Sequence, residues 1–148
     1  SIIGSAVTSC LAYEGGVVCA RDSGAVSIIE SDVTGCSAGS FGGVVYAWES
    51  ESLSIADVDF IDNGANTSAS VLYLREIKNT SISDASFTGN TAGDDKTIQT
   101  DKPIDWDCRL GSWMQTEGAF KGDFSAPECY PCSAGYYGNR SGRTNSSC

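Results

Sequence analysis

A pattern with a period of 27 residues runs along the first two thirds of the chain and constrains its fold more than any other feature. The segment GGVVCARDSGAVSI at 15–28 returns as GGVVYAWESESLSI at 42–55. Adding 27 again aligns apolar positions in columns, for example Ile28, Ile55 and Ile82. Self-similarity at a fixed period of this size is typical of repeat architectures, in which each unit stacks only on its neighbours.

Other positions align in the same way, and we expect them to form ladders inside a solenoid. Three of these columns are apolar, whereas the fourth changes from cysteine to asparagine and begins with a spacing of 26. The columns contain Val17, Val44, Val71 and Ile98; Val18, Val45 and Leu72; Val33, Phe60 and Phe87; and Cys10, Cys36, Asn63 and Asn90.

Each repeat consists of short β-rich runs. In the middle copy these are VVYAW at 44–48, SLSI at 52–55 and DVDFI at 57–61, and no segment keeps the apolar spacing of a helix for three turns. The alternation of inward-facing and outward-facing residues shifts by one position at Ala56 and Asp57, as it would at a corner between two strands. The pattern predicts an all-β fold, a parallel β-helix. It would be a single-stranded solenoid with about 27 residues and three short strands per coil, stacked about 4.8 Å apart.

The repeated motifs resemble those of the polymorphic outer-membrane-protein repeats. GGVV, which occurs twice, is similar to the family's GGA[I/L/V] motif, and FIDN at 60–63 and FTGN at 87–90 are similar to its FxxN motif. The likeness covers about two thirds of the chain and fails where VTSC, VTGC and SASV stand in these places. The resemblance implies a right-handed parallel β-helix that serves on cell surfaces, for adhesion or as a stalk.

We expect three parts along the chain: β-helix repeats at 1–100, a cap and connector at 101–128, and a cysteine-rich module at 129–148. An open end of a β-helix exposes unpaired backbone groups and needs a cover. Trp106 and Trp113 are therefore expected to pack on the last coil rather than to bind sugar.

The segment CYPCSAGYYGNRSGRTNSSC at the end resembles the small cysteine-rich modules of the ephrin-receptor, TNF-receptor and EGF-like type, in an incomplete form. Modules of this kind lack a core and depend on disulfides. The resemblance implies interleaved pairing, with Cys108 bonded to Cys132 and Cys129 bonded to Cys148. Sequential pairing, Cys108 with Cys129 and Cys132 with Cys148, stays open.

Two further cysteines fall in one column on adjacent coils. Cys10 and Cys36 would be separated by about one strand spacing, which lies inside the usual disulfide window of about 4.4–6.8 Å. We expect a bond between them, with two free, buried thiols as the alternative. Cys19 takes the place of Tyr46 and Tyr73 in its column and is the expected unpaired cysteine, acting as a small buried hydrophobe.

Charge and cysteine content limit the locations and partners that the chain can have. It has a net charge of −10, no histidine and seven cysteines. An acidic chain argues against nucleic acid as a partner, and no run of about eighteen apolar residues predicts a membrane span. Four N-x-[S/T] sequons together with many cysteines favour an extracellular location, secreted or at the cell surface, with N-linked glycans. The sequon asparagines are Asn66, Asn79, Asn139 and Asn145.

Two acidic columns are the strongest candidates for a site. Carboxylates about 4.8 Å apart repel one another unless water or a cation separates them. We consider a calcium site and acid–base hydrolysis of glycosides, and we expect solvated corners that keep the chain soluble, without a cofactor. The columns are Glu30, Asp57 and Asp84, where calcium would bind, and Asp22, Glu49 and Glu76; Asp32 and Asp59 flank the first.

Arg21, Trp48 and Arg75 form one further column of mixed type. Stacked on adjacent coils, the three side chains would form an Arg–Trp–Arg sandwich held by cation–π attraction. The alternative is an exposed contact for carbohydrate or for a protein partner.

These features predict a non-enzymatic structural or adhesive segment of a larger secreted, cell-surface or filament-forming glycoprotein. Its partners would be other segments or copies in the assembly, and the pairing of repeats and tail resembles large surface proteins of single-celled eukaryotes. One alternative is a carbohydrate-active enzyme or carbohydrate-binding β-helix on a pectin-lyase-like scaffold. Another is a receptor-like ectodomain that binds a ligand through its tail. We expect no enzyme, because the chain lacks histidine and a G-x-S-x-G motif.

Overall fold

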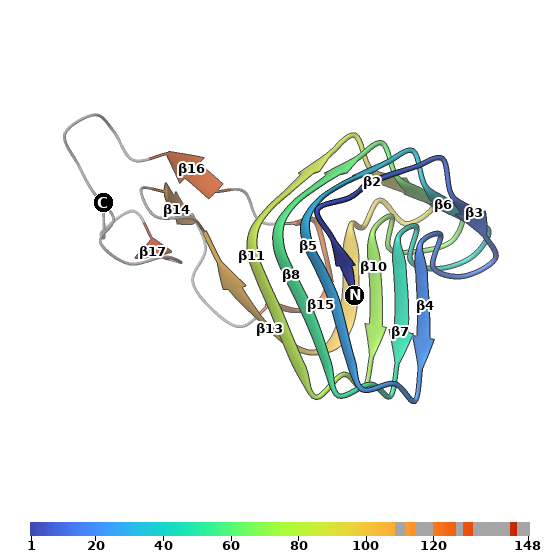
Figure 1. Cartoon of the computed structure of the whole chain (residues 1–148), viewed down its shortest axis with the longest axis horizontal. Coiled ribbons are helices and arrows are strands. Elements are labelled where there is room, and N and C mark those ends of the chain that lie inside the picture. Colours follow the sequence, from blue (N-terminus) through green and yellow to red (C-terminus); the bar gives the residue numbers. More distant parts are fainter. Residues whose placement is uncertain (109–111, 115–119, 127–128, 132–142, 145–148) are drawn as a thin grey trace.

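The protein is a parallel β-solenoid of about four turns, in which each coil lies beside the next along one axis (Figure 1). The structure, a computed structural model, describes residues 1–108, 112–114, 120–126, 129–131 and 143–144. All the elements it describes are strands, and none of the described residues forms a helix long and apolar enough to cross a membrane.

Three faces of parallel strands make up the solenoid. The longest strands form one face, strands of four residues form the second, and strands of two residues form the third. The first contains β1 (Ile2–Ile3), β2 (Ala6–Thr8), β5 (Ala25–Thr34), β8 (Ser52–Ile61), β11 (Asn79–Thr88) and the second half of β13 (Ile98–Asp107). The second contains β4 (Val18–Arg21), β7 (Val45–Trp48), β10 (Leu72–Arg75) and the first half of β13. The third contains β3 (Leu11–Ala12), β6 (Ser37–Ala38), β9 (Gly64–Ala65) and β12 (Thr91–Ala92).

The strand register confirms the period of 27 residues. Ile28 pairs with Ile55, and Ile55 pairs with Ile82, so that the predicted isoleucine column is an inward ladder, and all three side chains are buried. The register differs from the prediction at Ile98, which pairs with Leu72 and belongs to the neighbouring column, because the last step along the chain is 26 residues.

Phe60 and Phe87 stack at the next inward position, with ring centroids 5.0 Å apart. Trp106 pairs with Ile82 and so follows the isoleucine ladder, but its ring lies 5.6 Å from that of Phe87 and is almost fully buried. The prediction that Trp106 packs on the last coil is therefore confirmed, whereas the side chain of Trp113 lies outside the described ones. The core is a set of straight ladders, each formed by one position of the repeat.

The coil turns at residues with a left-handed backbone, which supply the corners of the solenoid. One such residue bends the long strand in the middle, so that SLSI and DVDFI are the two arms of β8 rather than separate strands. Asp57, at the predicted corner, has a φ of 55°. The corner rows are Gly4, Glu30, Asp57 and Asp84; Ser9, Gly35, Asp62 and Gly89; Gly15, Gly42, Ala69 and Asp95; and Asp22, Glu49 and Glu76.

Parallel pairing continues past residue 100, since Ser81 pairs with Asp105 and Ser83 pairs with Asp107. Beyond it, β15 (Phe120–Phe124) runs antiparallel along β13 from Ile98 to Ile104. A separate small sheet contains β14 (Ser112–Met114), β16 (Cys129–Pro131) and β17 (Arg143–Thr144). Strand β15 lies within the expected cap and connector at 101–128 and pairs with the last coil.

Candidate functional site

The outer surface of β4, β7 and β10 carries an aromatic row flanked by charged side chains. Tyr46 and Tyr73 occupy the same position on adjacent coils, and their rings stack with centroids 5.3 Å apart and planes 4° from parallel. Phe41 packs against Tyr73 at 4.7 Å. Burial raises the pKa of the Tyr46 phenol, because the ionised form would lose its hydration. Aromatic packing therefore holds this face of the solenoid together from outside.

Trp48 lies in one cross-strand row with Arg21 and Arg75, as predicted. The predicted Arg–Trp–Arg sandwich is wrong, however, because Arg21 lies over the ring of Tyr46, with its guanidinium carbon 5.2 Å from the centroid. An ion pair with Glu14 holds Arg21 there and raises its pKa. Since this carboxylate is on the preceding loop, the arginine turns away from its own row.

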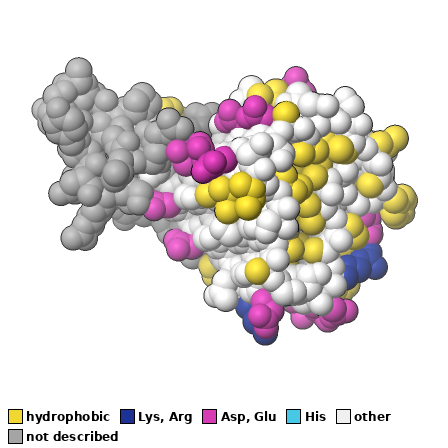
Figure 2. Space-filling view, in the orientation of Figure 1, with side chains coloured by type: hydrophobic (Ala, Val, Ile, Leu, Met, Phe, Trp, Pro, Cys, Tyr) yellow, Lys and Arg dark blue, Asp and Glu magenta, His cyan; other side chains and the backbone are white. Residues whose placement is uncertain are grey.

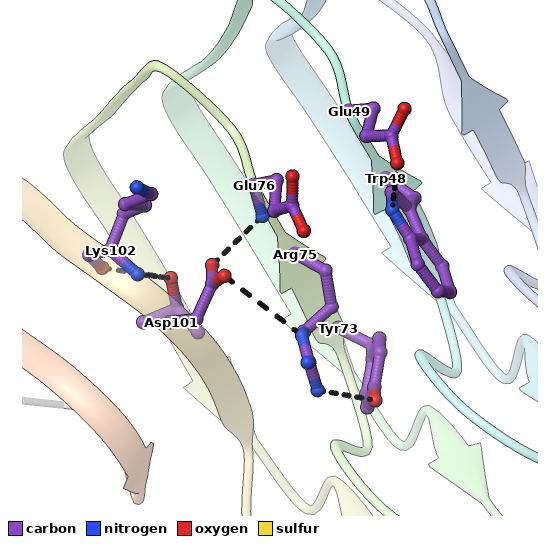
Figure 3. A network of polar contacts seen from close by, with 8 residues as sticks. Trp48, Glu49, Tyr73, Arg75, Glu76, Asp101 and Lys102 are labelled. Carbon is purple, nitrogen blue, oxygen red and sulfur yellow. Dashed lines mark hydrogen bonds and ion pairs between the residues drawn. The ribbon is translucent and has the colours of Figure 1, made fainter.

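Arg75 is held by polar neighbours on the same face (Figure 3). Its Nε is 4.0 Å from the Asp101 carboxylate, and its Nη1 donates to the Tyr73 hydroxyl at 3.5 Å. The other oxygen of Asp101 accepts the backbone N–H of Glu76 at 2.9 Å. Asp101 therefore takes the position of a fourth side chain in the row, on β13. It also satisfies a backbone donor at the corner of the preceding coil.

Trp48 is the open member of this face, with 40% of its surface exposed. Its indole Nε1 donates to Glu49 Oε1 at 2.8 Å, which fixes the ring against its own corner (Figure 3). Of the three predicted contact residues, Trp48 therefore presents an exposed aromatic surface, with polar groups on either side. Such a surface suits contact with a sugar ring or with a protein partner.

All six residues of the two acidic columns are corner residues with a left-handed backbone, with φ between 48° and 55°. Five of them are exposed and Asp84 is half-buried. Among the described residues, no group of three or more Asp, Glu or Cys side chains lies together in the way that a metal ion requires. The columns run along the axis with one carboxylate per coil, at two different corners of the coil.

The cysteine–asparagine column forms a polar ladder along another edge of the coils, with Cys36 and Asn63 buried and Cys10 and Asn90 half-buried. The Asn63 side chain accepts the N–H of Cys36 at 2.9 Å and donates to the carbonyl of Val33 at 2.9 Å. It also donates to Asn90 Oδ1 at 3.0 Å, and Asn90 donates to the carbonyl of Phe60. Each side chain therefore bonds backbone groups of the preceding coil, which an apolar residue in this place would leave unpaired.

Cys10 and Cys36 share this column. The predicted disulfide between them is absent, and both are free thiols. The Cys10 N–H instead donates to the Cys36 sulfur at 3.3 Å, so that sulfur takes the place that the amide oxygen of asparagine has in later coils. Burial raises the pKa of the Cys36 thiol. Cys19 is also free, as predicted, but it is exposed on the outer face rather than buried.

The remaining predicted residues lie in or near the tail. Cys108 is buried and disulfide-bonded, and the cysteine to which it is bonded is not among the described side chains. The predicted pairings that involve Cys129, Cys132 and Cys148 stay predictions. Asn66 and Asn79 are exposed, as glycan acceptors must be, whereas the sequons at Asn139 and Asn145 lie outside the described residues.

The residue that sequence reasoning missed on the aromatic face is Asp101. It stands beyond the recognised repeats, and its partners Arg75 and Glu76 become neighbours only when β13 pairs with β10. The spacing of 26 between Arg75 and Asp101 is the signal that places it in the row, one residue short of the period.

No protein-family model matches the chain, and comparisons with curated proteins and with solved structures also find no match.

Proposed function

We propose that this chain is a non-enzymatic structural or adhesive segment of a larger secreted, cell-surface or filament-forming glycoprotein. The observation that supports it best is the construction of the solenoid from continuous ladders. Ile28, Ile55 and Phe60 are among the fully buried side chains. The buried Asn63 and the half-buried Asn90 bond one coil to the next. A stack fixed in this way resists bending and keeps a constant outer surface along its axis, as a spacer or stalk requires.

The arrangement of the acidic residues also favours a structural role over hydrolysis. Glycosidases place two carboxyl groups about 5–9 Å apart on either side of the scissile bond. Here the columns of Asp57 and Glu49 lie on separate corners, at φ 55° and 50°, and follow the axis. Asp59, which flanks the first column, accepts a hydrogen bond from Ser86 on the next coil and is engaged in coil stacking. The proposal retains the likeness of the repeats to polymorphic outer-membrane-protein repeats and of the tail to cysteine-rich modules.

A structure of the chain within its native particle or its full-length parent protein, with glycans intact, tests the proposal. The expected result is an extracellular assembly in which the outer faces or ends of the solenoid contact neighbouring modules, with glycans at Asn66 and Asn79. In parallel, a panel of acidic and neutral polysaccharides would be incubated with the chain and assayed for released reducing ends. Bond cleavage that is lost in Asp57→Asn, and retained in Asp105→Asn, which removes a carboxylate at another exposed position, would overturn the proposal in favour of an enzyme.

Trp48 supports a second candidate, a carbohydrate-binding face on the same scaffold. Its ring is exposed beside Glu49 and lies in the row of Arg21 and Arg75. A glycan array tests this function: binding that falls at least tenfold in Trp48→Ala and is kept in Tyr13→Ala, an exposed aromatic residue of another face, supports it. No binding above background by the unaltered chain would exclude it. The third candidate, a ligand-binding tail, falls mostly outside the described residues and stays a prediction.

A further inference from the structure

One Asn-Gly pair occurs in the chain, Asn63–Gly64, and it lies where β8 ends and β9 begins. The backbone nitrogen of the residue after an asparagine can attack the side-chain amide, and glycine hinders this attack least because it has no Cβ and the freest backbone. The other asparagines precede bulkier residues, which are threonine after Asn66, Asn79 and Asn90, arginine after Asn139 and serine after Asn145. In an unfolded chain, spontaneous deamidation is therefore fastest at Asn63.

Deamidation at this pair needs no enzyme and no reactant other than water. Hydroxide removes the proton of the Gly64 amide, and the nitrogen then forms a bond to Cγ of Asn63. The bond from Cγ to Nδ2 breaks, and ammonia leaves with a proton taken from water, so that a cyclic succinimide remains. Water adds to either ring carbonyl and opens the ring, which gives aspartate or isoaspartate without any oxidation or reduction.

In the folded chain the attacking group is held in a strand ladder. Gly64 donates its N–H to the Cys36 carbonyl at 2.9 Å and pairs with Ser37 of β6. The amide has to lose this proton before it can attack, so the hydrogen bond keeps the nitrogen in its unreactive form. Strand pairing on the third face thus protects the nucleophile.

The side chain under attack is held in the same way. Asn63 Oδ1 accepts the N–H of Cys36 at 2.9 Å. Its Nδ2 donates to the Val33 carbonyl at 2.9 Å and to Asn90 Oδ1 at 3.0 Å. The residue is 1% exposed, which keeps water and hydroxide away from it. Ring closure requires the side chain to rotate out of this ladder, and that rotation breaks these bonds together, as in a local opening of neighbouring coils.

The fold does not require glycine at position 64. Gly64 does not have a left-handed backbone, and a Cβ there would meet nothing closer than the carbonyl oxygen of Thr91, at 3.4 Å. The same row carries Ser37 on the preceding coil and Thr91 on the next. A side chain therefore fits at this position, and packing does not impose the reactive pair.

Neither product fits the ladder. In aspartate an oxygen replaces Nδ2 and faces two acceptors, the Val33 carbonyl and Asn90 Oδ1, in a buried site. In isoaspartate the side-chain methylene carbon becomes part of the main chain, which lengthens one coil against its neighbours and disturbs the register of β9. Either product adds a negative charge to a net charge of −10, and Figure 2 shows acidic side chains already at several places on the solenoid surface.

We propose that Asn63–Gly64 is a spontaneous modification site that the stacking of the coils protects, and that its deamidation in an opened chain prevents the solenoid from re-forming. The strands of the third face are two residues long, so local opening of this face is sufficient to expose the pair. Unfolding is reversible while the asparagine is intact and irreversible once it has reacted. The inference does not depend on the structural role proposed above, which the native-particle experiment tests separately.

Timed incubation of the unglycosylated full chain in urea and in buffer, at the same mildly alkaline pH and temperature, tests the protection. Peptide mapping by mass spectrometry follows the conversion of each asparagine. In urea, Asn63 is expected to react before Asn66 and Asn90. In buffer its reaction is expected to be at least about 100-fold slower, because the rate follows the fraction of opened chains. Gly64→Ala is expected to remove the fast reaction in urea.

Refolding measures the consequence. After each interval in urea the chain is diluted into buffer, and the fraction that regains its far-UV circular dichroism is expected to fall in step with the conversion of Asn63. Gly64→Ala, treated identically, is expected to keep refolding, which separates deamidation from aggregation and from oxidation of free thiols. Asn63→Asp, which is the product with an unaltered main chain, is expected to lower the urea midpoint of unfolding. Asn66→Asp adds the same charge at an exposed position and is the matched control.

Three results would overturn the proposal. Conversion of Asn63 in buffer as fast as in urea would show that the fold gives no protection. Full refolding of converted chains would show that the products fit the ladder, as would an Asn63→Asp variant as stable as Asn66→Asp.

Discussion

Corner residues carry the conformational strain of this solenoid. Glu30, Glu49 and Glu76 hold a left-handed backbone, with φ of 49°, 50° and 53°, where glycine would be at ease. For other residues this conformation costs about 1–2 kcal/mol, because Cβ approaches the carbonyl oxygen. The cost is tolerated at these corners because the paired strands and stacked side chains on both sides fix the path of the backbone.

Replacing a strained corner residue with glycine is therefore expected to stabilise the fold. Glu49→Gly should raise the free energy of unfolding by about 1 kcal/mol in urea denaturation. Gly42→Ala is the opposite test at another corner. It should destabilise by several times that amount, since its Cβ would lie 2.1 Å from the carbonyl oxygen of Val45. A loss of stability in Glu49→Gly would show that the carboxylate, rather than the backbone, determines this position.

The three free cysteines among the described residues differ in access to reagents. Cys19 is exposed, Cys10 is half-buried and Cys36 is fully buried with a raised pKa. In the native protein a thiol reagent at neutral pH is expected to modify Cys19 first and Cys36 only after unfolding, as peptide mapping would show. Failure of Cys10 and Cys36 to react in denaturant without reductant would reveal a bond between them and contradict the free thiols.

At the scale of the element, asparagine side chains join one coil to the next. Asn63, which is 1% exposed, bonds Cys36, Val33 and Asn90 at once. Asn63→Ala would remove the side-chain partner of the Cys36 N–H and of the Val33 carbonyl, at about 1–3 kcal/mol each before relaxation. Asn90 Oδ1 would keep the backbone N–H of Asn63. We expect a loss of about 3 kcal/mol in the free energy of unfolding.

The matched control for this ladder is Asn66→Ala, three residues further on the same coil and exposed, measured on unglycosylated protein. It is expected to stay within about 0.5 kcal/mol of the unaltered chain. Equal stability of the two variants would contradict a structural role for the asparagine ladder.

At the scale of the whole molecule, exposed carboxylates repel one another along the stack. The net charge is −10, and the acidic columns place like charges on successive coils. Raising NaCl from about 20 to 500 mM should therefore raise the midpoint of thermal unfolding by about 2–4 °C through screening.

The same experiment distinguishes screening from a specific cation site. Calcium and magnesium at equal ionic strength are expected to act alike, with no difference between the unaltered chain and Asp57→Asn beyond the loss of one charge. A midpoint that rises with calcium at micromolar concentration, and only while Asp57 is present, would contradict this expectation and establish the calcium site considered for Glu30, Asp57 and Asp84.

The sequence by itself determined the period, the β-solenoid and most of its ladders. Residues such as Ile55 and Phe60 recur at one position of every coil, and a side chain that stacks on its own kind needs only local spacing to be recognised. The sequence also predicts the corner at Asp57, because the alternation of inward-facing and outward-facing residues shifts there. The short strands of the third face, such as Gly64–Ala65, carry no β-rich signal and were missed.

Only the tertiary structure decided which side chains meet across the outer face. Arg21 turns to Tyr46 because Glu14 stands on the preceding loop, and Asp101 joins Arg75 after a step of 26 residues. Periodicity aligns residues in rows, but it does not say toward which neighbour a long charged side chain turns. Strand β15, which pairs with the last coil, comes from chain beyond the repeat, where the 27-residue pattern carries no information.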